Sequence, residues 1–316
     1  MIRMAYLDNY LLRKSLEKDY VGRMDVVALN EKWREAKNLY PELTALKYSV
    51  RQMLISPFGI LLQIAKGYEN VMKGIGSKDR KKAIYNHLRY NVFAYSGKRH
   101  NEMIAPFFIE HADDLQLYTC HYCDMAFINI FSYTVKESGV ERKRAQFELD
   151  HVISQKDCPL LALSLYNFVP SCPVCNSRIK HQKGIASSKK LMKKFSPTSN
   201  DYHFDSMVDI VLEPKDGAAT PYMEHCDKYD IVFDCSKDKD YEEYVDNLFL
   251  TERYNCHKVE ALRLKDLQLY YPDSHIWGIS NLVKRPFGEV KEDVFGQRFA
   301  RDEHRLFKKL RRDMMR

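Results

Sequence analysis

Four of the eight cysteines form two pairs in which two residues separate the thiols. Cys120 and Cys123 make the first pair, and Cys172 and Cys175 make the second, within SCPVCN. A CxxC pair can occupy two corners of the tetrahedron around a zinc ion, and two such pairs complete a closed structural site. A redox function fits either pair alone, but neither lies in a thioredoxin-like βαβ pattern. The spacing therefore favours structural zinc.

A second group of polar residues lies between the two pairs. The strand-like stretch FELDHVI carries Asp150 and His151 side by side, Asn167 follows in YNFVPS, and Asn176 comes directly after the second CxxC pair. An ordinary half-buried strand with a solvated outer face would also place polar residues among apolar ones. The order Asp-His, Asn and CxxC-Asn, with Lys180 on the following helix, favours a functional site over that interpretation.

This combination resembles the HNH endonucleases of the ββα-metal, or His-Me finger, superfamily, in the subgroup whose finger is braced by a four-cysteine zinc site. The resemblance covers roughly residues 118–183, about a fifth of the chain. It implies a fold in which two strands and a helix carry the catalytic groups. It also implies hydrolysis of phosphodiester bonds.

The resemblance assigns a role to each residue of the group. His151 would be the general base that deprotonates a water, and Asn167 would orient its imidazole by a hydrogen bond. Asp150 and Asn176 would supply oxygen ligands to one divalent cation, for which Mg²⁺ or Mn²⁺ is suited. Asn176 stands where the family name has its final histidine, so we expect weaker affinity for softer metals.

Basic residues after Asn176 are expected to contact phosphate groups. Lys180 lies four residues later on the same helix face, and Arg178 and Lys183 are its neighbours. A solvated charge is the alternative for each of them, and we rank phosphate contact above it only for Lys180.

Other polar residues and thiols near the motif are expected to play minor parts. Glu148 shares a strand face with Asp150 and is either an outer helper or a solvent-facing acid. His121 and His181 are expected to be bystanders. The remaining cysteines lack metal-ligand spacing and are expected to be ordinary thiols: Cys158, Cys226, Cys235 and Cys256.

The charge distribution favours a polyanionic partner. The formal net charge is +7, but residues 178–194 carry seven basic residues and no acids, and residues 298–316 carry eight basic residues against three acids. The remainder of the chain is therefore mildly acidic, and two basic patches on such a body are typical of nucleic-acid binding. We expect DNA as the partner, with RNA as the alternative.

The elements that must position these residues suggest an α+β chain. Residues 9–95 place apolar residues at helical spacings, short strands rich in aromatic and β-branched residues surround the motif, and a mixed, largely helical region ends in a basic helix. We expect that terminal helix to carry one apolar stripe, formed by Phe295, Phe299, Leu306, Leu310 and Met314. The expected regions are a helical region at 1–115, a ββα-metal nuclease domain with its zinc site at 116–195, and a C-terminal region at 196–316.

No apolar stretch approaches the roughly 20 residues of a membrane helix, and the first residues lack the apolar segment of a secretory signal. We therefore expect a cytoplasmic protein without a membrane partner, in which eight cysteines stay reduced.

The flanking regions are similar to those of bacterial HNH nucleases of phage-defence and mobile-element loci, some of which work with an ATPase partner. A double-strand break would require two active sites, so a homo-oligomer is one expectation. The alternative to a nuclease is a zinc-stabilised nucleic-acid-binding or assembly module without catalysis.

Overall fold

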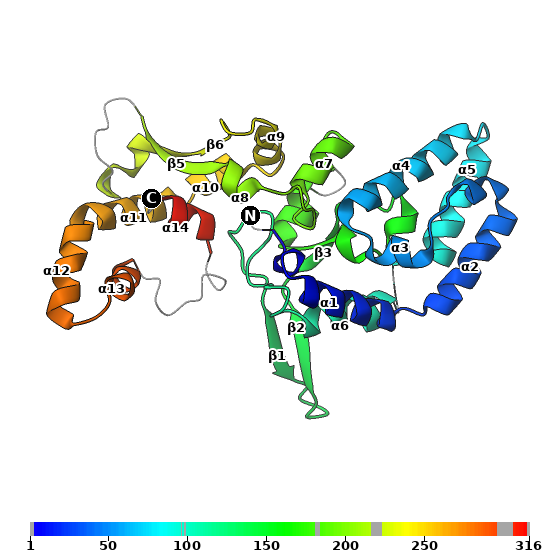
Figure 1. Cartoon of the computed structure of the whole chain (residues 1–316), viewed down its shortest axis with the longest axis horizontal. Coiled ribbons are helices and arrows are strands. Elements are labelled where there is room, and N and C mark those ends of the chain that lie inside the picture. The colour runs from blue at the N-terminus through cyan, green and yellow to red at the C-terminus, as the bar shows by residue number, and fades with distance from the viewer. Residues whose placement is uncertain are drawn as a thin grey trace. The chain divides into compact units, whose positions relative to one another are not determined.

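The computed structural model describes residues 3–95, 97, 99–180, 184–215, 223–295 and 306–314 (Figure 1). This part of the chain is mostly helical with small two-stranded antiparallel sheets, an α+β composition as expected. None of its helices is long and apolar enough to cross a membrane.

The chain groups into two compact units. The N-terminal unit contains Ile2–Leu117 and Ile128–Tyr202, and the C-terminal unit contains Tyr118–Phe127 and His203–Arg316. The expected division into three regions, with boundaries at residues 115 and 195, stays a prediction.

The helices of the N-terminal unit begin at the capping residues that their sequences provide. Asn9, Asp25 and Ser77 each accept a hydrogen bond from the backbone N–H three residues ahead, which starts α1, α2 and α5. The α-helices of this unit are α1 (Tyr10–Arg23), α2 (Val26–Leu39), α3 (Val50–Ile55), α4 (Phe58–Gly74), α5 (Lys78–His87), α6 (Ala105–Glu110) and α7 (Lys189–Phe195).

Two wider helical turns extend this set. Leu88–Val92 continues α5, and His100–Ile104 precedes α6, both with π-helical hydrogen bonds. Helices α3 and α4 and the turn Leu88–Val92 pack against Pro159–Leu161. The N-terminal helices therefore support a segment that lies in the middle of the predicted nuclease motif.

Four strands of the N-terminal unit form two sheets. Strand β1 (Ile130–Thr134) pairs with β2 (Glu141–Ala145), and β3 (Glu148–His151) pairs with β4 (Phe168–Ser171). The segment Val174–Lys180, which is helical with π-type hydrogen bonds, follows β4 after a short link. The order along the chain after β2 is thus strand, strand and helix.

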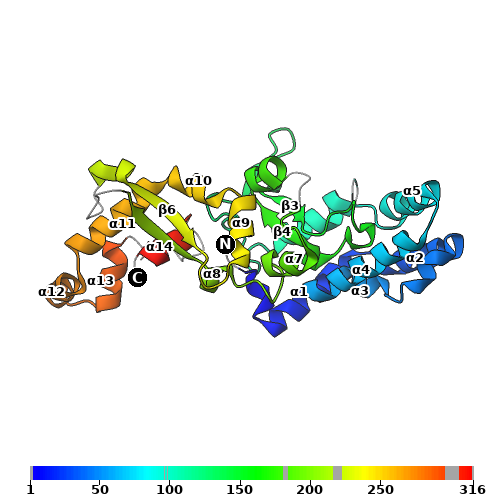
Figure 2. The same cartoon turned by 90° about the horizontal axis from the view of Figure 1, so that it is seen from above.

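The C-terminal unit contains a third sheet with helices beside it. Its elements are α8 (Phe204–Met207), β5 (Asp209–Pro214), β6 (Tyr229–Asp234), α9 (Asp240–Asn247), α10 (Leu250–Asn255), α11 (Lys258–Tyr270), α12 (Asp273–Val283), α13 (Phe287–Val294) and α14 (Lys308–Met314). Figure 2 shows α11 and α14 beside the β5–β6 sheet. The aromatic residues Phe204, Tyr241, Tyr244 and Tyr254 are fully buried in this unit.

The apolar positions expected to form a stripe on one terminal helix belong to different elements. Phe295 follows the end of α13 and Leu306 precedes α14, while Leu310 and Met314 are buried on α14. Phe299 lies outside the described residues. The prediction of one stripe on one helix is therefore wrong, because α13 and α14 are separate helices.

Candidate active site and metal centre

The two CxxC pairs come together in space. The sulfur atoms of Cys120, Cys123, Cys172 and Cys175 lie within 4.8 Å of one another, and all four side chains are buried. Zinc–thiolate bonds of about 2.3 Å place the sulfurs of a tetrahedral site roughly 3.8 Å apart. The cluster therefore has the composition and the spacing to hold a metal ion such as zinc.

The backbone around the cysteines forms the tight turns that thiolate ligands require. The amide of Cys120 donates to the Ala126 carbonyl at 2.9 Å, and the amide of Cys175 donates to the Cys172 sulfur at 3.4 Å. The phenol of Tyr254 donates to the Cys123 carbonyl at 2.8 Å. The contacts of Cys120 and Cys123 add hydrogen bonds that support the first turn.

The residue after Cys123 also starts α14. The backbone carbonyl of Asp124 accepts from the Phe307 amide at 2.7 Å, and its carboxylate accepts from the Lys309 amide at 3.2 Å. Asp124 is fully buried and has a φ of 55°. Through its carboxylate and its backbone carbonyl, Asp124 thus accepts hydrogen bonds from two amides at the start of a helix far along the sequence.

The other thiols lie apart from the cluster. Cys158 and Cys235 are buried, and burial raises the pKa of the Cys158 thiol to about 12 and that of Cys235 to about 11. Cys226 is half-buried and Cys256 is exposed. His121 is buried between the cysteines of the first pair but is not part of the ligand cluster.

Strand β3 and the segment Val174–Lys180 bring the predicted acid, Asp150, against the predicted phosphate contact, Lys180. The ammonium of Lys180 lies 2.5 Å from both carboxylate oxygens of Asp150, and it also donates to the His151 backbone carbonyl at 3.0 Å. Both side chains are buried. In this arrangement the ammonium of Lys180 forms an ion pair with the carboxylate of Asp150.

The imidazole of His151 has a backbone partner at Nε2, and the side-chain amide of Gln155 lies 3.5 Å from Nδ1. Its Nε2 lies 2.9 Å from the carbonyl oxygen of Ala162, an acceptor, so Nε2 carries the proton. The other nitrogen, Nδ1, then keeps its lone pair. The rings of Tyr95 and Phe168 contact the imidazole with centroid separations of 4.6 Å and 4.7 Å.

These surroundings keep the imidazole neutral. Burial lowers the pKa of His151 to about 4, although the Ala162 carbonyl and the charge of Asp150 oppose the shift. At neutral pH the ring is therefore a hydrogen-bond acceptor at Nδ1 rather than a cation.

Asn167 acts on the loop and not on the imidazole. Its Oδ1 accepts from the Ile153 amide at 2.7 Å, and its Nδ2 donates to the carbonyls of Ile153 at 2.9 Å and Leu161 at 3.1 Å. The expected contact with His151 is replaced by an indirect one, because Leu161 precedes the residue whose carbonyl holds the ring. Asn167 is fully buried, so these bonds are made without competition from water.

Asn176 contacts Glu148, for which the sequence predicts only a minor part. Its Nδ2 donates to Glu148 Oε2 at 2.9 Å, and Ser177 donates to the same oxygen at 2.5 Å. Glu148 and Asp150 share one face of β3, and Asn176 and Lys180 share one face of the following helix. Strand β3 and the helical segment are therefore joined at two points. Two neutral donors contact the carboxylate of Glu148, and the ammonium of Lys180 contacts the carboxylate of Asp150.

These groups line a cavity of about 330 Å³ in the N-terminal unit. Its walls include Asp150, His151, Asn176, Lys180 and Arg89. Of the expected phosphate contacts other than Lys180, Arg178 is exposed, and Lys183, with the bystander His181, lies outside the described residues.

Two residues of this region were missed in the sequence. Arg89 lines the cavity and lies over the rings of Tyr85 and Tyr90, and Tyr95 packs edge-on against His151. Both lie more than fifty residues before Asp150, at or just after the helical segment Leu88–Val92, where no spacing or motif links them to the cavity. Only the clustering of aromatic residues with a basic one in LRYNVFAY gave a signal.

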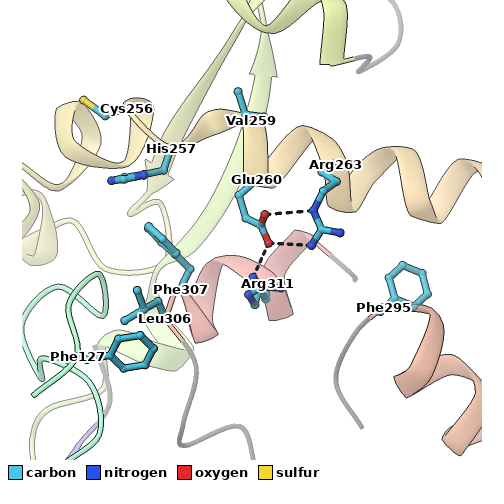
Figure 3. A pocket seen from close by; sticks show the side chains of 10 residues that line it. All are labelled: Phe127, Cys256, His257, Val259, Glu260, Arg263, Phe295, Leu306, Phe307 and Arg311. Carbon is cyan, nitrogen blue, oxygen red and sulfur yellow. Dashed lines mark hydrogen bonds and ion pairs between the residues drawn. The ribbon is translucent and has the colours of Figure 1, made fainter. Parts of the chain in front are cut away.

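A second cavity, of about 730 Å³, lies in the C-terminal unit (Figure 3). Glu260 accepts from Arg263 at 3.1 and 3.2 Å and pairs with Arg311 at 2.5 Å. The other walls are largely apolar and include Phe127, Phe295 and Phe307. This cavity is larger, and its two guanidinium groups share Glu260, the one carboxylate among the described residues that line it.

Comparison with known proteins identified no relative of this chain. No family model, curated protein or solved structure matches this chain. The case for its function therefore rests on the residues and their geometry.

The two basic segments are partly neutralised within the protein. On α14, Lys309 pairs with Asp313 at 2.9 Å and Arg312 pairs with Asp205. On α7, Lys193 pairs with Asp201 at 2.7 Å and Lys189 pairs with Glu69. Charge counts along the sequence therefore overstate the positive potential that these two helices offer to a partner.

Proposed function

We propose that the protein is a metal-dependent HNH endonuclease that hydrolyses phosphodiester bonds in DNA. The observation that carries the proposal is the imidazole of His151, which is held at Nε2 by the Ala162 carbonyl and keeps Nδ1 as a base beside Asp150 in one polar cavity. The succession of β3, β4 and the segment Val174–Lys180 supports a ββα-metal finger.

The chemistry assigned to the protein's own groups is proton transfer at His151. The neutral imidazole accepts a proton at Nδ1 from a water, the water oxygen forms a bond to phosphorus, and the bond from phosphorus to the 3′ oxygen breaks. The contacts with Tyr95 and Phe168 restrict rotation of the ring, so the basic nitrogen keeps its direction. Asn167 maintains this arrangement through the loop that carries Ala162.

Asp150 and Asn176 would hold the divalent cation. The donor types fit, because Asp150 offers a carboxylate and Asn176 uses its Nδ2 on Glu148, which leaves Oδ1 as a ligand atom. Oxygen ligands suit Mg²⁺ or Mn²⁺, which when bound neutralises charge on the phosphate and stabilises the departing oxygen. Lys180 must then share Asp150 or release it, and we propose that a released ammonium pairs with a phosphate oxygen.

The cysteine cluster has a separate role in this proposal. Four buried thiolates close a tetrahedral zinc site and leave no open position for a substrate, so zinc stabilises the fold and takes no part in hydrolysis. The two metals should therefore differ in how they are lost, because a chelator removes an oxygen-ligated cation far more easily than a zinc ion bound by four thiolates.

The second candidate function is a zinc-stabilised nucleic-acid-binding module without catalysis. The contact of Lys180 with Asp150 favours it, because a buried ammonium occupies the carboxylate that would bind the catalytic cation. In this case His151 would be a packed, neutral ring with a structural role.

A plasmid cleavage assay separates the two candidates. Supercoiled DNA is incubated with protein and Mg²⁺ or Mn²⁺, and nicked and linear products are quantified for the wild type, for His151→Ala and for the matched control His275→Ala, whose ring is exposed on α12. We expect wild type and control to cleave, and His151→Ala to lose at least about a hundredfold in rate. Cleavage that survives in His151→Ala would reject the assigned base. Silence from all three, with RNA tested in parallel, would favour the binding module.

A further inference from the structure

The β1–β2 hairpin carries two aromatic and two arginine side chains on one face. Phe131 lies opposite Arg144 and Tyr133 lies opposite Arg142 in the antiparallel register. Because residues alternate between the faces of a strand, these four share a face, whereas Lys143, opposite Ser132, lies on the other. Figure 1 shows the hairpin extending from the same unit that contains α1 and α6.

The aromatic side chains of this face are open to solvent. Phe131 is 42% exposed and Tyr133 is 41% exposed, with ring centroids 6.3 Å apart. An aromatic ring normally contributes to stability by being buried, so two neighbouring exposed rings on one ribbon gain little for folding. Their position is better explained by a ligand with flat, apolar faces.

The basic side chains beside them are not neutralised by the protein. Within the described residues, no carboxylate pairs with Arg142, Lys143 or Arg144. The basic residues of α7 and α14 differ, because several of those are engaged by Glu69, Asp201, Asp205 or Asp313. The hairpin is therefore one part of the N-terminal unit where positive charge and exposed aromatic rings coincide.

We propose that this face binds single-stranded DNA. Bases of an unpaired strand stack on Phe131 and Tyr133, and Arg142 and Arg144 pair with its phosphates, a combination that binds single strands with little sequence preference. A duplex would offer phosphates to the arginines but would keep its bases stacked on each other and away from the rings. The choice of DNA as the polyanion rests on the proposed function.

The hairpin is also connected to the candidate active site. Only Gln146 and Phe147 separate β2 from β3, which carries Asp150 and His151. At about 3.3 Å per extended residue, the six steps from Arg144 to Asp150 span at most about 20 Å. A strand held on the hairpin is thus kept within a few nucleotides of the cavity, and the proposal predicts cleavage near junctions between duplex and single-stranded DNA.

The test is a binding measurement that needs no cleavage. Fluorescence anisotropy in EDTA measures the affinity of the full chain for labelled oligothymidylate, for duplex DNA and for oligouridylate, each over a series of salt concentrations. The variants are Phe131→Ala, Tyr133→Ala and Arg144→Gln, with Lys143→Gln as the matched control, because it removes the same charge from the next residue on the opposite face.

We expect each aromatic substitution to weaken oligothymidylate binding at least about fivefold. Arg144→Gln should lower the salt slope by about 0.7, and Lys143→Gln should change it much less. Equal effects of Arg144→Gln and Lys143→Gln, wild-type affinity in both aromatic variants, or a preference for duplex or for RNA would each overturn the proposal. Circular dichroism of each variant is the check that it is folded. Binding by the hairpin without cleavage of plasmid, junction DNA or RNA would reject the nuclease and keep this inference. Cleavage by a protein whose hairpin variants bind as wild type would reject this inference and keep the nuclease.

Discussion

The cysteine cluster and the His151 cavity both contain residues with recognisable chemistry, but the two sites differ in how their polar groups are partnered. In the cluster, four identical groups converge and are fully buried. In the cavity, nearly every polar group already has a partner in the protein: Asp150 has Lys180, Asn176 has Glu148, and His151 has Ala162 at one nitrogen. In the roles proposed above, the four thiols of the cluster converge on one ion, whereas the cavity uses the lone pair that His151 keeps at Nδ1.

The largest expected effect belongs to the cluster. Cys172→Ser should prevent stable folding, because binding of a structural zinc ion contributes on the order of 10 kcal/mol to the folding of small zinc domains. Elemental analysis should find stoichiometric zinc in the wild type and little in the variant, and thermal unfolding followed by circular dichroism should lose its cooperative transition. Cys256→Ser, at an exposed position, is the control and should behave as wild type. A Cys172→Ser protein as stable as the control would contradict the assignment of the cluster.

The next effect tests whether the cavity can exchange its cation. Lys180→Met leaves the buried carboxylate of Asp150 without its ion pair, which should cost about 3–5 kcal/mol of stability. Mn²⁺ should then raise the melting temperature of Lys180→Met more than that of the wild type, because the vacated carboxylate can take the metal without releasing an ammonium. Lys156→Met, at another lysine lining the cavity, is the control. An equal Mn²⁺ response in all three proteins would argue against Asp150 as a metal ligand.

A smaller effect is expected where the support is indirect. Asn167→Ala removes three buried hydrogen bonds and should lower the free energy of unfolding by about 2–4 kcal/mol. Cleavage should fall as well, since the loop that presents the Ala162 carbonyl loses its fixation. Urea unfolding and initial cleavage rates measure the two changes, with Asn91→Ala at an exposed position as the control. Full activity in a destabilised Asn167→Ala protein would separate this residue from the chemistry.

The smallest effect is the pH dependence. Because the pKa of His151 is lowered to about 4, the ring stays deprotonated from pH 8 down to pH 5, and the cleavage rate at saturating substrate should be flat over that range. An ordinary histidine, with a pKa of about 6.5, would already lose activity below pH 7. The same shift affects stability. The unfolded chain takes up a proton on His151 near pH 6.5, whereas the folded protein does so only near pH 4. The free energy of unfolding is therefore highest above about pH 6.5 and decreases as the pH falls toward 4. Rates and melting temperatures measured side by side test both statements.

The parts of the site that could be predicted from the sequence are those fixed by local spacing. Two thiols separated by two residues identify a ligand pair wherever the chain carries them, and Asn176 and Lys180 share a helix face because four residues separate them. The partner of Lys180 could not be predicted, since spacing gives the face of a helix but not the acid that lies opposite. Arg89 and Tyr95 reach the cavity only through the packing of helices distant in sequence.

The same distinction holds for the fold. The α+β class and the helical N-terminal region follow from apolar periodicity and capping residues, which act locally. The prediction of one apolar stripe on one terminal helix was wrong because the stripe residues belong to two elements, α13 ending at Val294 and α14 beginning at Lys308. Apolar spacing alone does not show where one helix ends and the next begins. Charge counts along the sequence also failed to show that Asp205 and Asp313 already engage the basic side chains of α14.

The hydrogen bonds that Asp124 accepts at the start of α14 connect the first cysteine turn to the stability of that helix. The turn of the first cysteine pair provides the cap of a helix about 185 positions later, so a thiolate turn that relaxes also uncaps that helix. Amide hydrogens of α14 should then exchange faster with solvent in chelator-treated protein than in zinc-loaded protein. Exchange at the far end of the chain would therefore report the occupancy of the cysteine cluster, and proteases that trim a frayed C-terminus would preferentially degrade molecules that have lost their metal.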